Sequence, residues 1–432
     1  MIGGLLFGVF VLLIVVGAPI GVAMGLAAMA AVAAANVDQS WFGLLAASQN
    51  ALAGIEKYPL MALPMFVLVG SIFDRSGVAQ RMVNFATACV GRGPGMLPAV
   101  AISVAMVLGG ISGSSVANAA AVGGVMIGAM GRAGYPAPFA VSVVGAAAAT
   151  DVLIPPSIAF VVYSVIVPSA SVPALFAAGM IPGILAGIAL IVPAVLLSRR
   201  HGFGARDQAL PKPPFWKSLA EASWGLAAPV LILGGMRIGL FTPTEAAVAA
   251  VVYGLFVGMV VHKTLRLRDL PGMFREAAEV SAVIMTVIAL ASIFSYSVNT
   301  LGLADPIVHG IQALGLGSFG TMCLVIFAVL IVGTVLEGVP IFLIFLPVLA
   351  PLMQAFQWDT VWFGVLLTMA MAIGCFTPPL GVNLLVACRM SGVGVEKTLP
   401  WAAWLVATFV LAMVAVMVMP GLATWLPRSL GY

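Results

Sequence analysis

Long apolar stretches recur along the whole 432-residue chain and are separated by short polar segments. A helix needs about 20 apolar residues to cross a bilayer, and the pattern predicts ten such spans. They lie near residues 2–16, 20–35, 58–73, 137–167 and 174–198 in the first half, and near 224–240, 244–261, 279–299, 360–388 and 400–427 in the second. The pattern predicts an all-α polytopic membrane protein.

A polar, glycine-rich tip followed by a Pro-Pro interruption occurs twice. Gly110 precedes Pro155 by 45 residues, and Gly333 precedes Pro378 by the same number. Proline removes a backbone donor and clashes with the preceding turn, so each Pro-Pro should break its helix. We therefore expect re-entrant hairpins at 96–130 and 320–353, and broken helices at 137–167 and 360–388. Paired interruptions of this kind are typical of a transporter's midplane binding site.

The chain divides into two repeats, 1–217 and 218–432, with five full crossings each. An odd number of crossings inverts the second copy relative to the first. Lys and Arg concentrate in cytoplasmic loops, and the inverted topology places all of them there except Lys57, Arg237 and Arg428. The loops that it makes cytoplasmic are 74–94, 131–136, 199–217, 262–276 and 389–397.

Composition excludes other classes of protein. Hydrophobic residues make up 62% of the chain and charged residues 7%, whereas soluble domains are about 25% charged. The surroundings of this chain are therefore a lipid bilayer. The net charge of +4 comes from short loops between spans, so no nucleic-acid partner is expected.

The broken helices and tips carry the candidate chemistry. Carbonyls freed by unwinding and the C-terminal ends of half-helices can coordinate a cation, while half-helix N-termini can hold an anionic group. Hydroxyl, amide and carbonyl oxygens suit the hard cation sodium. The alternative is that small residues only let the helices pack closely. The candidate sodium or substrate residues are Ser112, Ser114, Ser115, Asn118, Thr150, Asp151, Thr334, Glu337, Gly374, Thr377, Gly381 and Asn383.

Asp151 and Glu337 are the acidic residues expected deep in the membrane. Buried carboxylates are costly there and are functional candidates by default. They could bind sodium, carry protons or pair with a cation. A structural hydrogen bond or ion pair is the alternative.

One motif suggests an enzyme instead. Residues 110–113 spell the Gly-x-Ser-Gly of intramembrane serine proteases, which need a histidine base within the membrane. His201, His262 and His309 all lie in or beside loops. We therefore expect no enzyme, and the intramembrane hydrolase is disfavoured.

Several motifs together carry a resemblance to a known family. They are Gly110-Ile111-Ser112-Gly113-Ser114-Ser115, Gly134-Tyr135, Ile154-Pro155-Pro156-Ser157-Ile158, Gly338-Val339-Pro340, Pro347, Pro351, Phe363-Gly364 and Thr377-Pro378-Pro379-Leu380-Gly381-Val382-Asn383. With these motifs the chain resembles, over essentially its whole length, the large membrane (M) subunit of a tripartite ATP-independent periplasmic (TRAP) transporter.

The resemblance implies sodium-coupled uptake of carboxylates, sugar acids and related organic acids in the bacterial inner membrane. It implies an elevator mechanism, in which hairpins and broken helices move against a scaffold. It also implies two partners, a separate small four-helix membrane subunit and a periplasmic solute-binding protein.

Two residues depart from the family pattern. Asp151 stands where a small residue, commonly glycine, is expected, and Glu337 stands where aspartate is common. Both changes touch the expected ion sites, which leaves proton coupling as an alternative to sodium coupling. The remaining alternative is a stand-alone ion-coupled anion transporter of a related two-hairpin fold.

Overall fold

The computed structural model describes residues 2–37, 43–90, 93–205, 213–336 and 338–432. Within these residues the chain is helical between short turns and contains no strand, so the expected all-α fold is confirmed. In the first half the helices are α1 (Ile2–Val15), α2 (Ile20–Ala35), α3 (Leu44–Ile55), η1 (Tyr58–Met61), α4 (Ala62–Arg75), α5 (Val78–Val90), α6 (Met96–Ser112), α7 (Ser115–Arg132), α8 (Ala137–Ala148), η2 (Asp151–Leu153), α9 (Ile158–Ile166) and α10 (Val172–Arg200).

The second half repeats much of this order. Its helices are α11 (Phe215–Arg237), α12 (Pro243–Phe256), η4 (Val257–Val261), η5 (Leu267–Asp269), α13 (Leu270–Thr300), α14 (Ala304–Ala313), α15 (Gly317–Gly333), α16 (Gly338–Ala355), α17 (Thr360–Gly374), α18 (Val382–Ser391), η6 (Val395–Thr398), α19 (Leu399–Val418) and α20 (Gly421–Ser429).

Within the described ranges, six helical segments are long and apolar enough to cross a membrane. The number rises to eight if each of two bent helix pairs, α8 with α9 and α14 with α15, forms one span. Other apolar helices, including α1 and α2, are only 10–17 residues long. The chain is therefore a multi-pass membrane protein, and the count of ten spans stays a prediction.

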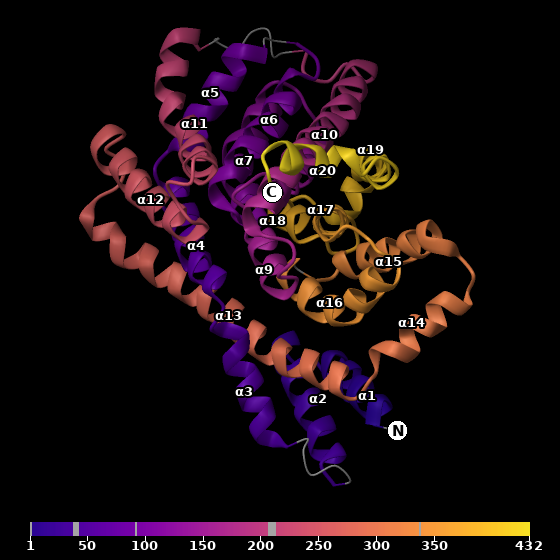
Figure 1. Ribbon diagram of the computed structural model, residues 1–432. Coiled ribbons are helices and arrows are strands. Elements are labelled where there is room, and N and C mark those ends of the chain that lie inside the picture. Colours follow the sequence, from indigo (N-terminus) through magenta and orange to yellow (C-terminus); the bar gives the residue numbers. More distant parts are fainter. Residues whose placement is uncertain (1, 38–42, 91–92, 206–212, 337) are drawn as a thin grey trace.

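Two groups of helices face each other within the molecule (Figure 1). The first, which we call the scaffold layer, consists of α2, α3, α4, α12 and α13. The long helix α13 packs against α2, α3 and α4, and α12 packs against α4. The second span of each half therefore pairs with the third span of the other half. This reciprocal exchange joins the two halves through their second and third spans.

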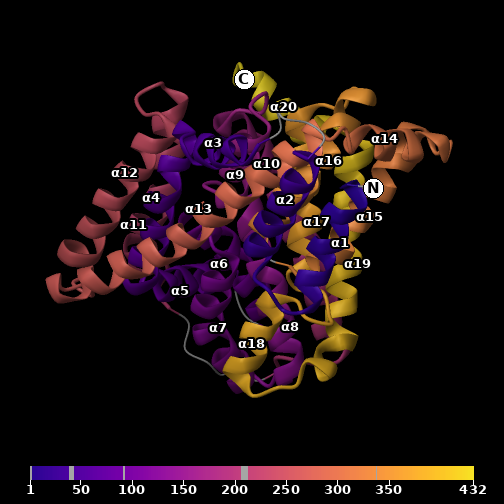
Figure 2. The same cartoon turned by 90° about the horizontal axis from the view of Figure 1, so that it is seen from below.

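The second group, the hairpin body, consists of α6 to α9 and α15 to α18. Helix α8 packs against α6, α7 and α18, and α15 packs against α17. Figure 2 shows the same arrangement from below, with α6, α7 and α8 in the middle and α11 and α12 at one edge. The hairpin body contacts the scaffold layer through α4 with α6 and through α13 with α16.

Helices occupy three segments that the sequence pattern treats as loops. They are α3, α5 and α14, which contain 12, 13 and 10 residues. A pattern that seeks about 20 apolar residues overlooks helices this short. The expected last span, 400–427, is also divided at Pro420 into α19 and α20. These are corrections to the sequence-based assignment.

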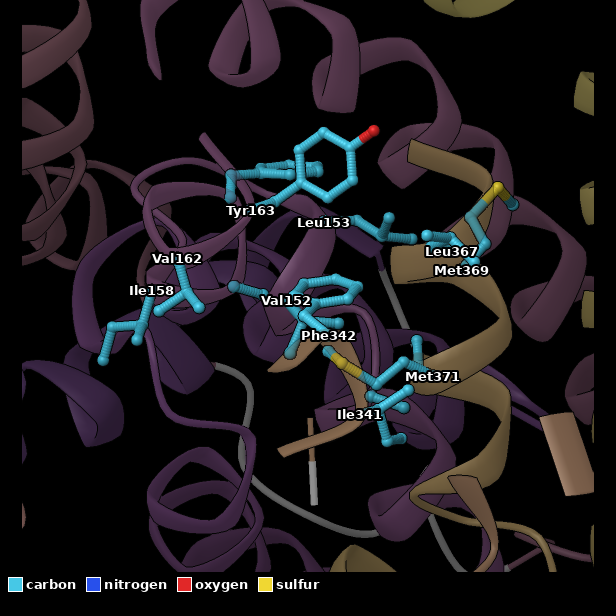
Figure 3. Close-up of a cluster of buried hydrophobic side chains, with 14 of the residues drawn as sticks. Val152, Leu153, Ile158, Val162, Tyr163, Ile341, Phe342, Leu367, Met369 and Met371 are labelled. Atoms are coloured by element: carbon cyan, nitrogen blue, oxygen red, sulfur yellow. The ribbon is translucent and has the colours of Figure 1, made fainter. Parts of the chain in front are cut away.

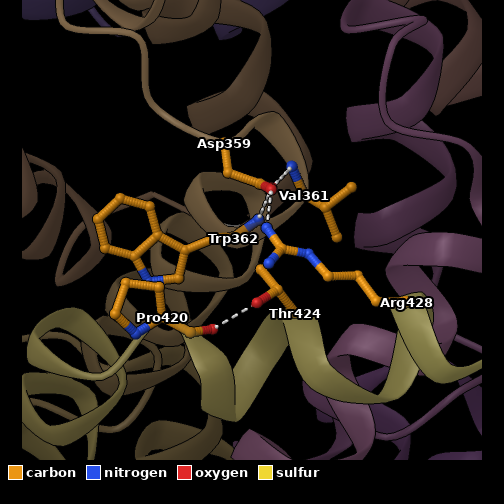
Figure 4. A network of polar contacts seen from close by, with 6 residues as sticks. All are labelled: Asp359, Val361, Trp362, Pro420, Thr424 and Arg428. Carbon is orange, nitrogen blue, oxygen red and sulfur yellow. Dashed lines mark hydrogen bonds and ion pairs between the residues drawn. The ribbon is translucent and has the colours of Figure 1, made fainter.

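A polar network holds α20 against the start of α17 (Figure 4). Asp359 caps α17 because its Oδ1 accepts hydrogen bonds from the backbone N–H groups of Val361 at 2.9 Å and Trp362 at 3.0 Å. The guanidinium of Arg428 in α20 lies 3.5 Å from Asp359 Oδ2. The C-terminal helix is thus tied to the N-terminus of the second broken helix.

Candidate ion and solute site

The first broken helix is interrupted between α8 and α9. The two helical parts, Ala137–Leu153 and Ile158–Ile166, are bent by 43°, and the Pro155-Pro156 bond between them is cis. The Thr150 hydroxyl donates to Ala147 O at 2.7 Å, and the Ser157 hydroxyl donates to Val152 O at 2.7 Å. Local side chains therefore satisfy part of the interrupted backbone.

The second broken helix is interrupted between α17 and α18 and also contains a cis Pro378-Pro379 bond. Gly381 precedes α18 with φ of 49°, a left-handed conformation that favours glycine. Its N–H donates to Thr334 O at 3.2 Å, which joins the break to the tip of the second hairpin. The N–H of Asn383 donates to Cys375 O at 2.9 Å across the break.

Each hairpin tip rests directly on the break of its own half. A Cβ atom placed on Gly109 would lie 2.6 Å from Asp151 Cα, and one on Gly110 would lie 2.8 Å from Pro155 O. In the second half, a Cβ atom on Gly374 would lie 2.6 Å from Gly333 Cα. Real Cβ atoms do not approach this closely, so glycine permits the contact in both halves.

A cavity of about 510 Å³, which we call cavity 1, lies between the scaffold layer and the hairpin body. Ser114 and Ser115 line it from the first tip, and Asn383 lines it from the second broken helix. The structure therefore brings candidate residues from both halves to one cavity. The scaffold side of cavity 1 comes from α4 and α13.

Four helix N-termini meet at cavity 1. Its lining includes Ser115, Ile158 and Val382, the first residues of α7, α9 and α18, and Pro340, the third residue of α16. The first turn of a helix carries a partial positive charge, although here the Asn383 N–H already donates to Cys375 O and Pro340 has no N–H. Their convergence favours an anionic group in cavity 1.

Buried amide groups beside these termini offer oxygen ligands. Asn383 is fully buried, and no hydrogen-bond partner for its side chain exists among the described residues. Asn118 donates through Nδ2 to Ala105 O at 2.8 Å, but its buried Oδ1 has no partner within the described part of the chain. A hard cation would satisfy such oxygens, because it prefers oxygen ligands.

The other candidate residues lie around cavity 1 in different ways. Thr150 and Asp151 are fully buried, and neither lines cavity 1. The hydroxyls of Thr334 and Thr377 donate to Ile331 O at 2.7 Å and to Ile373 O at 2.6 Å in the helices that precede them. Gly374 and Gly381 contribute backbone at the second break. The Ser112 side chain and Glu337 lie outside the described part of the structure.

Sequence reasoning missed an acidic wall on the scaffold side of cavity 1. Asp74 of α4 and Glu276 and Glu279 of α13 line it. Arg75 lies 2.7 Å from Glu276, and Arg275 lies 2.7 Å from Glu279. The sequence shows that the two glutamates lie three residues apart on one helix, which indicates that they share a face. Their meeting with Asp74 depends on the packing of α13 against α4.

These features define the class of protein. Paired tips and broken helices that enclose a cavity between two helical bodies are typical of a secondary transporter. Residues 7–422 match the family model described as the tripartite ATP-independent periplasmic transporter, DctM component. The chain belongs to this family, which confirms the resemblance found in the sequence, and it is a transport protein rather than an enzyme.

Characterised relatives are similar over most of the chain. The C4-dicarboxylate TRAP transporter large permease protein DctM of Rhodobacter capsulatus is 33% identical and covers 99% of both chains. The sialic acid TRAP transporter large permease protein SiaM of Vibrio cholerae is 33% identical and covers 97% of both. The isethionate TRAP transporter permease protein DctMQ of Oleidesulfovibrio alaskensis is 35% identical over 91% of this chain, which spans only 61% of that relative.

A solved structure shares the fold. It is the YdaH transporter of Alcanivorax borkumensis, described as having an unusual topology. The TM-score is 0.61 with 15% sequence identity, and the match covers 90% of this chain and 91% of the other. At this identity the likeness concerns the fold alone.

Proposed function

We propose that this chain is the large permease subunit of a sodium-coupled importer of an organic acid, either a carboxylate or a sugar acid. The convergence of four helix N-termini from both tips and both breaks on cavity 1 carries the proposal. The names of the relatives include a C4-dicarboxylate, sialic acid and isethionate, all of them organic acids. Such anions suit the positive ends of helices.

Sodium would use the oxygens beside these termini. The amide oxygens of Asn383 and Asn118 are buried and lack partners among the described residues, and carbonyls of the interrupted backbone would add ligands. Within the same residues, no group of three or more His, Cys, Asp or Glu forms a metal centre. Amide, hydroxyl and carbonyl oxygens suit a hard monovalent cation. Bound sodium would offset the charge of the acid and join its binding to the sodium gradient.

The position of cavity 1 supports an elevator mechanism. Its walls come from two bodies, α4 and α13 of the scaffold layer and the tips and breaks of the hairpin body. Displacement of the hairpin body along α13 would carry the tips, the breaks and their bound solute together. The scaffold layer would stay in place through its reciprocal pairing of spans.

Membership of the TRAP family supports an assembly with two partner proteins and a location in a bacterial membrane. The assembly would contain a separate small four-helix membrane subunit and a periplasmic solute-binding protein that delivers the acid. It would lie in the bacterial inner membrane.

Uptake by the reconstituted assembly tests this function. The chain, its cognate small membrane subunit and its binding protein are placed in liposomes and offered radiolabelled succinate, N-acetylneuraminate or isethionate. We expect uptake of at least one anion, only with an inward sodium gradient and only with the binding protein present. Uptake that a proton gradient alone supports, or that needs no binding protein, would contradict the proposal.

A further inference from the structure

A second cavity, cavity 2, lies along the same interface as cavity 1 and has a volume of about 280 Å³. Cavity 1 contacts α13 between residues 276 and 287, and cavity 2 contacts it between residues 288 and 299. At 1.5 Å per residue, the two contacts are centred about 18 Å apart along the helix. The two cavities also follow one another along helix α9, because Ile158 lines cavity 1 and Val165 lines cavity 2.

An apolar cluster lies in the hairpin body beside the two cavities (Figure 3). It gathers Val152, Ile158 and Val162 of the first half with Phe342 and Met371 of the second. The rings of Tyr163 and Phe342 meet edge to face with centroids 5.7 Å apart. Cavity 1 includes Pro340 of α16 and cavity 2 includes Leu343 and Pro347, so the two linings follow one another along this helix as well.

The charged residues that line the two cavities differ. Asp74, Glu276 and Glu279 line cavity 1, and Arg75 and Arg275 form ion pairs with the two glutamates. Cavity 2 is lined by one charged residue of the described chain, Lys57. By Coulomb's law an organic anion is attracted to Lys57 in cavity 2, whereas at cavity 1 the helix N-termini are what favours it.

Lys57 is placed to meet an anion. Its ammonium donates to Val165 O at the C-terminal end of α9, at 2.5 Å. Partial burial of the ammonium lowers the pKa of Lys57, although the residue as a whole is exposed. An ammonium has three donors, so Lys57 can keep Val165 O and still donate to a carboxylate or sulfonate. The amides of Asn50 and Asn299 and the hydroxyls of Ser292 and Ser295 add polar groups to the same cavity.

We propose that cavity 2 is a loading site for the transported organic anion, with Lys57 as the residue that recognises its charge. Loop charge predicts that cavity 1 faces the cytoplasm, because loops 74–94 and 262–276 lie at its end of α4 and α13. Cavity 2 then faces the periplasm. The cation of cavity 2 favours capture of the anion there, before it reaches the helix N-termini around cavity 1. This inference rests on the proposed transport of an organic anion.

Chemical protection of Lys57 tests the site without transport. The purified full chain reacts with N-hydroxysuccinimide acetate, and mass spectrometry follows acetylation of Lys57, with Lys263, which lines neither cavity, as internal reference. An anion at ten times its dissociation constant should slow the reaction of Lys57 about tenfold. We expect protection by succinate, N-acetylneuraminate or isethionate, none by uncharged succinamide, and no change at Lys263. If none of the three anions slows acetylation of Lys57 relative to the reaction without anion, the proposal is overturned.

Uptake kinetics then test the role of the charge. With the transported anion, Lys57→Gln should raise KM for uptake about tenfold, through loss of one charge-assisted contact. Lys57→Arg should keep KM within about threefold of the wild-type value, because the charge remains. An unchanged KM in Lys57→Gln would refute the recognition role. If the wild-type assembly transports none of the three anions, the proposed function fails, and protection of Lys57 still decides whether cavity 2 binds them.

Discussion

Both broken helices make a close backbone contact with the hairpin of their own half. In the first half the glycine that permits it lies in the hairpin, and in the second half it lies in the break. Four residues before its first proline, the first break has Asp151 and the second has Gly374. In the first half the hairpin glycine Gly109 makes room for the Asp151 backbone. In the second half the glycine of the break makes room for the hairpin, because a Cβ on Gly374 would meet the Gly333 backbone.

This exchange frees one position in the first break for a side chain. Asp151 brings a carboxyl group into the interior without disturbing the tip, because Gly109 takes over the steric role that Gly374 has in the second half. The second break instead places the amide of Asn383 at the cavity. The two halves therefore share the same close contact and differ in whether the break carries a carboxyl group.

The largest expected effect comes from adding a methyl group at the second contact. In Gly374→Ala, the new Cβ would lie 2.6 Å from Gly333 Cα, and a backbone cannot move aside as a flexible side chain can. Overpacking of this kind costs about 1–3 kcal/mol or more. We expect a lower melting temperature of the purified protein and loss of uptake.

Gly333→Ala is the matched control, because a Cβ there would lie 3.5 Å from Gly374 Cα, an ordinary contact distance. It should fold and transport nearly as the wild type does. Gly109→Ala should behave like Gly374→Ala, since its Cβ would lie 2.6 Å from Asp151 Cα. If Gly374→Ala is as stable as Gly333→Ala, glycine is not required at position 374 of the second break.

The next effect concerns the charge that distinguishes the copies. Asp151→Asn keeps the shape of the side chain and removes its charge. If the carboxylate contributes to a sodium site, the sodium concentration for half-maximal uptake should rise by roughly one to two orders of magnitude, since interactions with a charged group are worth about 1.5–3 kcal/mol. Sodium titration of uptake by the reconstituted assembly measures this.

Asp151→Gly is the more stringent test, because it gives the first break the glycine that the second break has at Gly374. It should show the same loss of sodium affinity while the protein stays folded. Sodium dependence that matches the wild type in both variants would assign Asp151 a structural role.

A smaller effect is expected at the neutral ligands. Asn383→Ala and Ser114→Ala each remove one uncharged oxygen, and a neutral hydrogen-bonding group contributes about 1 kcal/mol. The half-saturating sodium concentration should therefore rise about fivefold in each. Ser429→Ala, in α20 and outside the lining of cavity 1, is the control. Unchanged sodium affinity in both site variants would refute their assignment as ligands.

The sequence predicts those parts of the site that local chemistry determines. Pro-Pro breaks a helix wherever it occurs within one, so both breaks fall where the sequence predicts them. Ser114, Ser115 and Asn383 follow from the same pattern and do line cavity 1. The family was also recognisable from the motifs around these residues, and the family model confirms it.

Other parts depend on packing between distant segments. The acidic wall joins Asp74 to Glu276 and Glu279 across about 200 residues of chain, and no local pattern reveals that meeting. Helices α3, α5 and α14 were missed because they are too short for a search for spans. The hydroxyls of Thr334 and Thr377 donate to carbonyls of the helices that precede them, which residue type alone does not indicate.

The smallest expected effect lies at the start of the broken helices, where the copies differ again. Helix α8 follows Pro136, whereas α17 follows Asp359, which caps it and faces Arg428. Exposed ion pairs contribute about 0–1 kcal/mol, and a lost N-cap costs roughly 1 kcal/mol. Arg428→Ala should therefore lower the unfolding free energy less than Asp359→Ala, with uptake preserved in Arg428→Ala. Thermal unfolding of the two single variants and the double variant measures the difference. Equal losses in the single variants, with no further loss in the double variant, would show that the ion pair stabilises this end of α17 and that the cap does not.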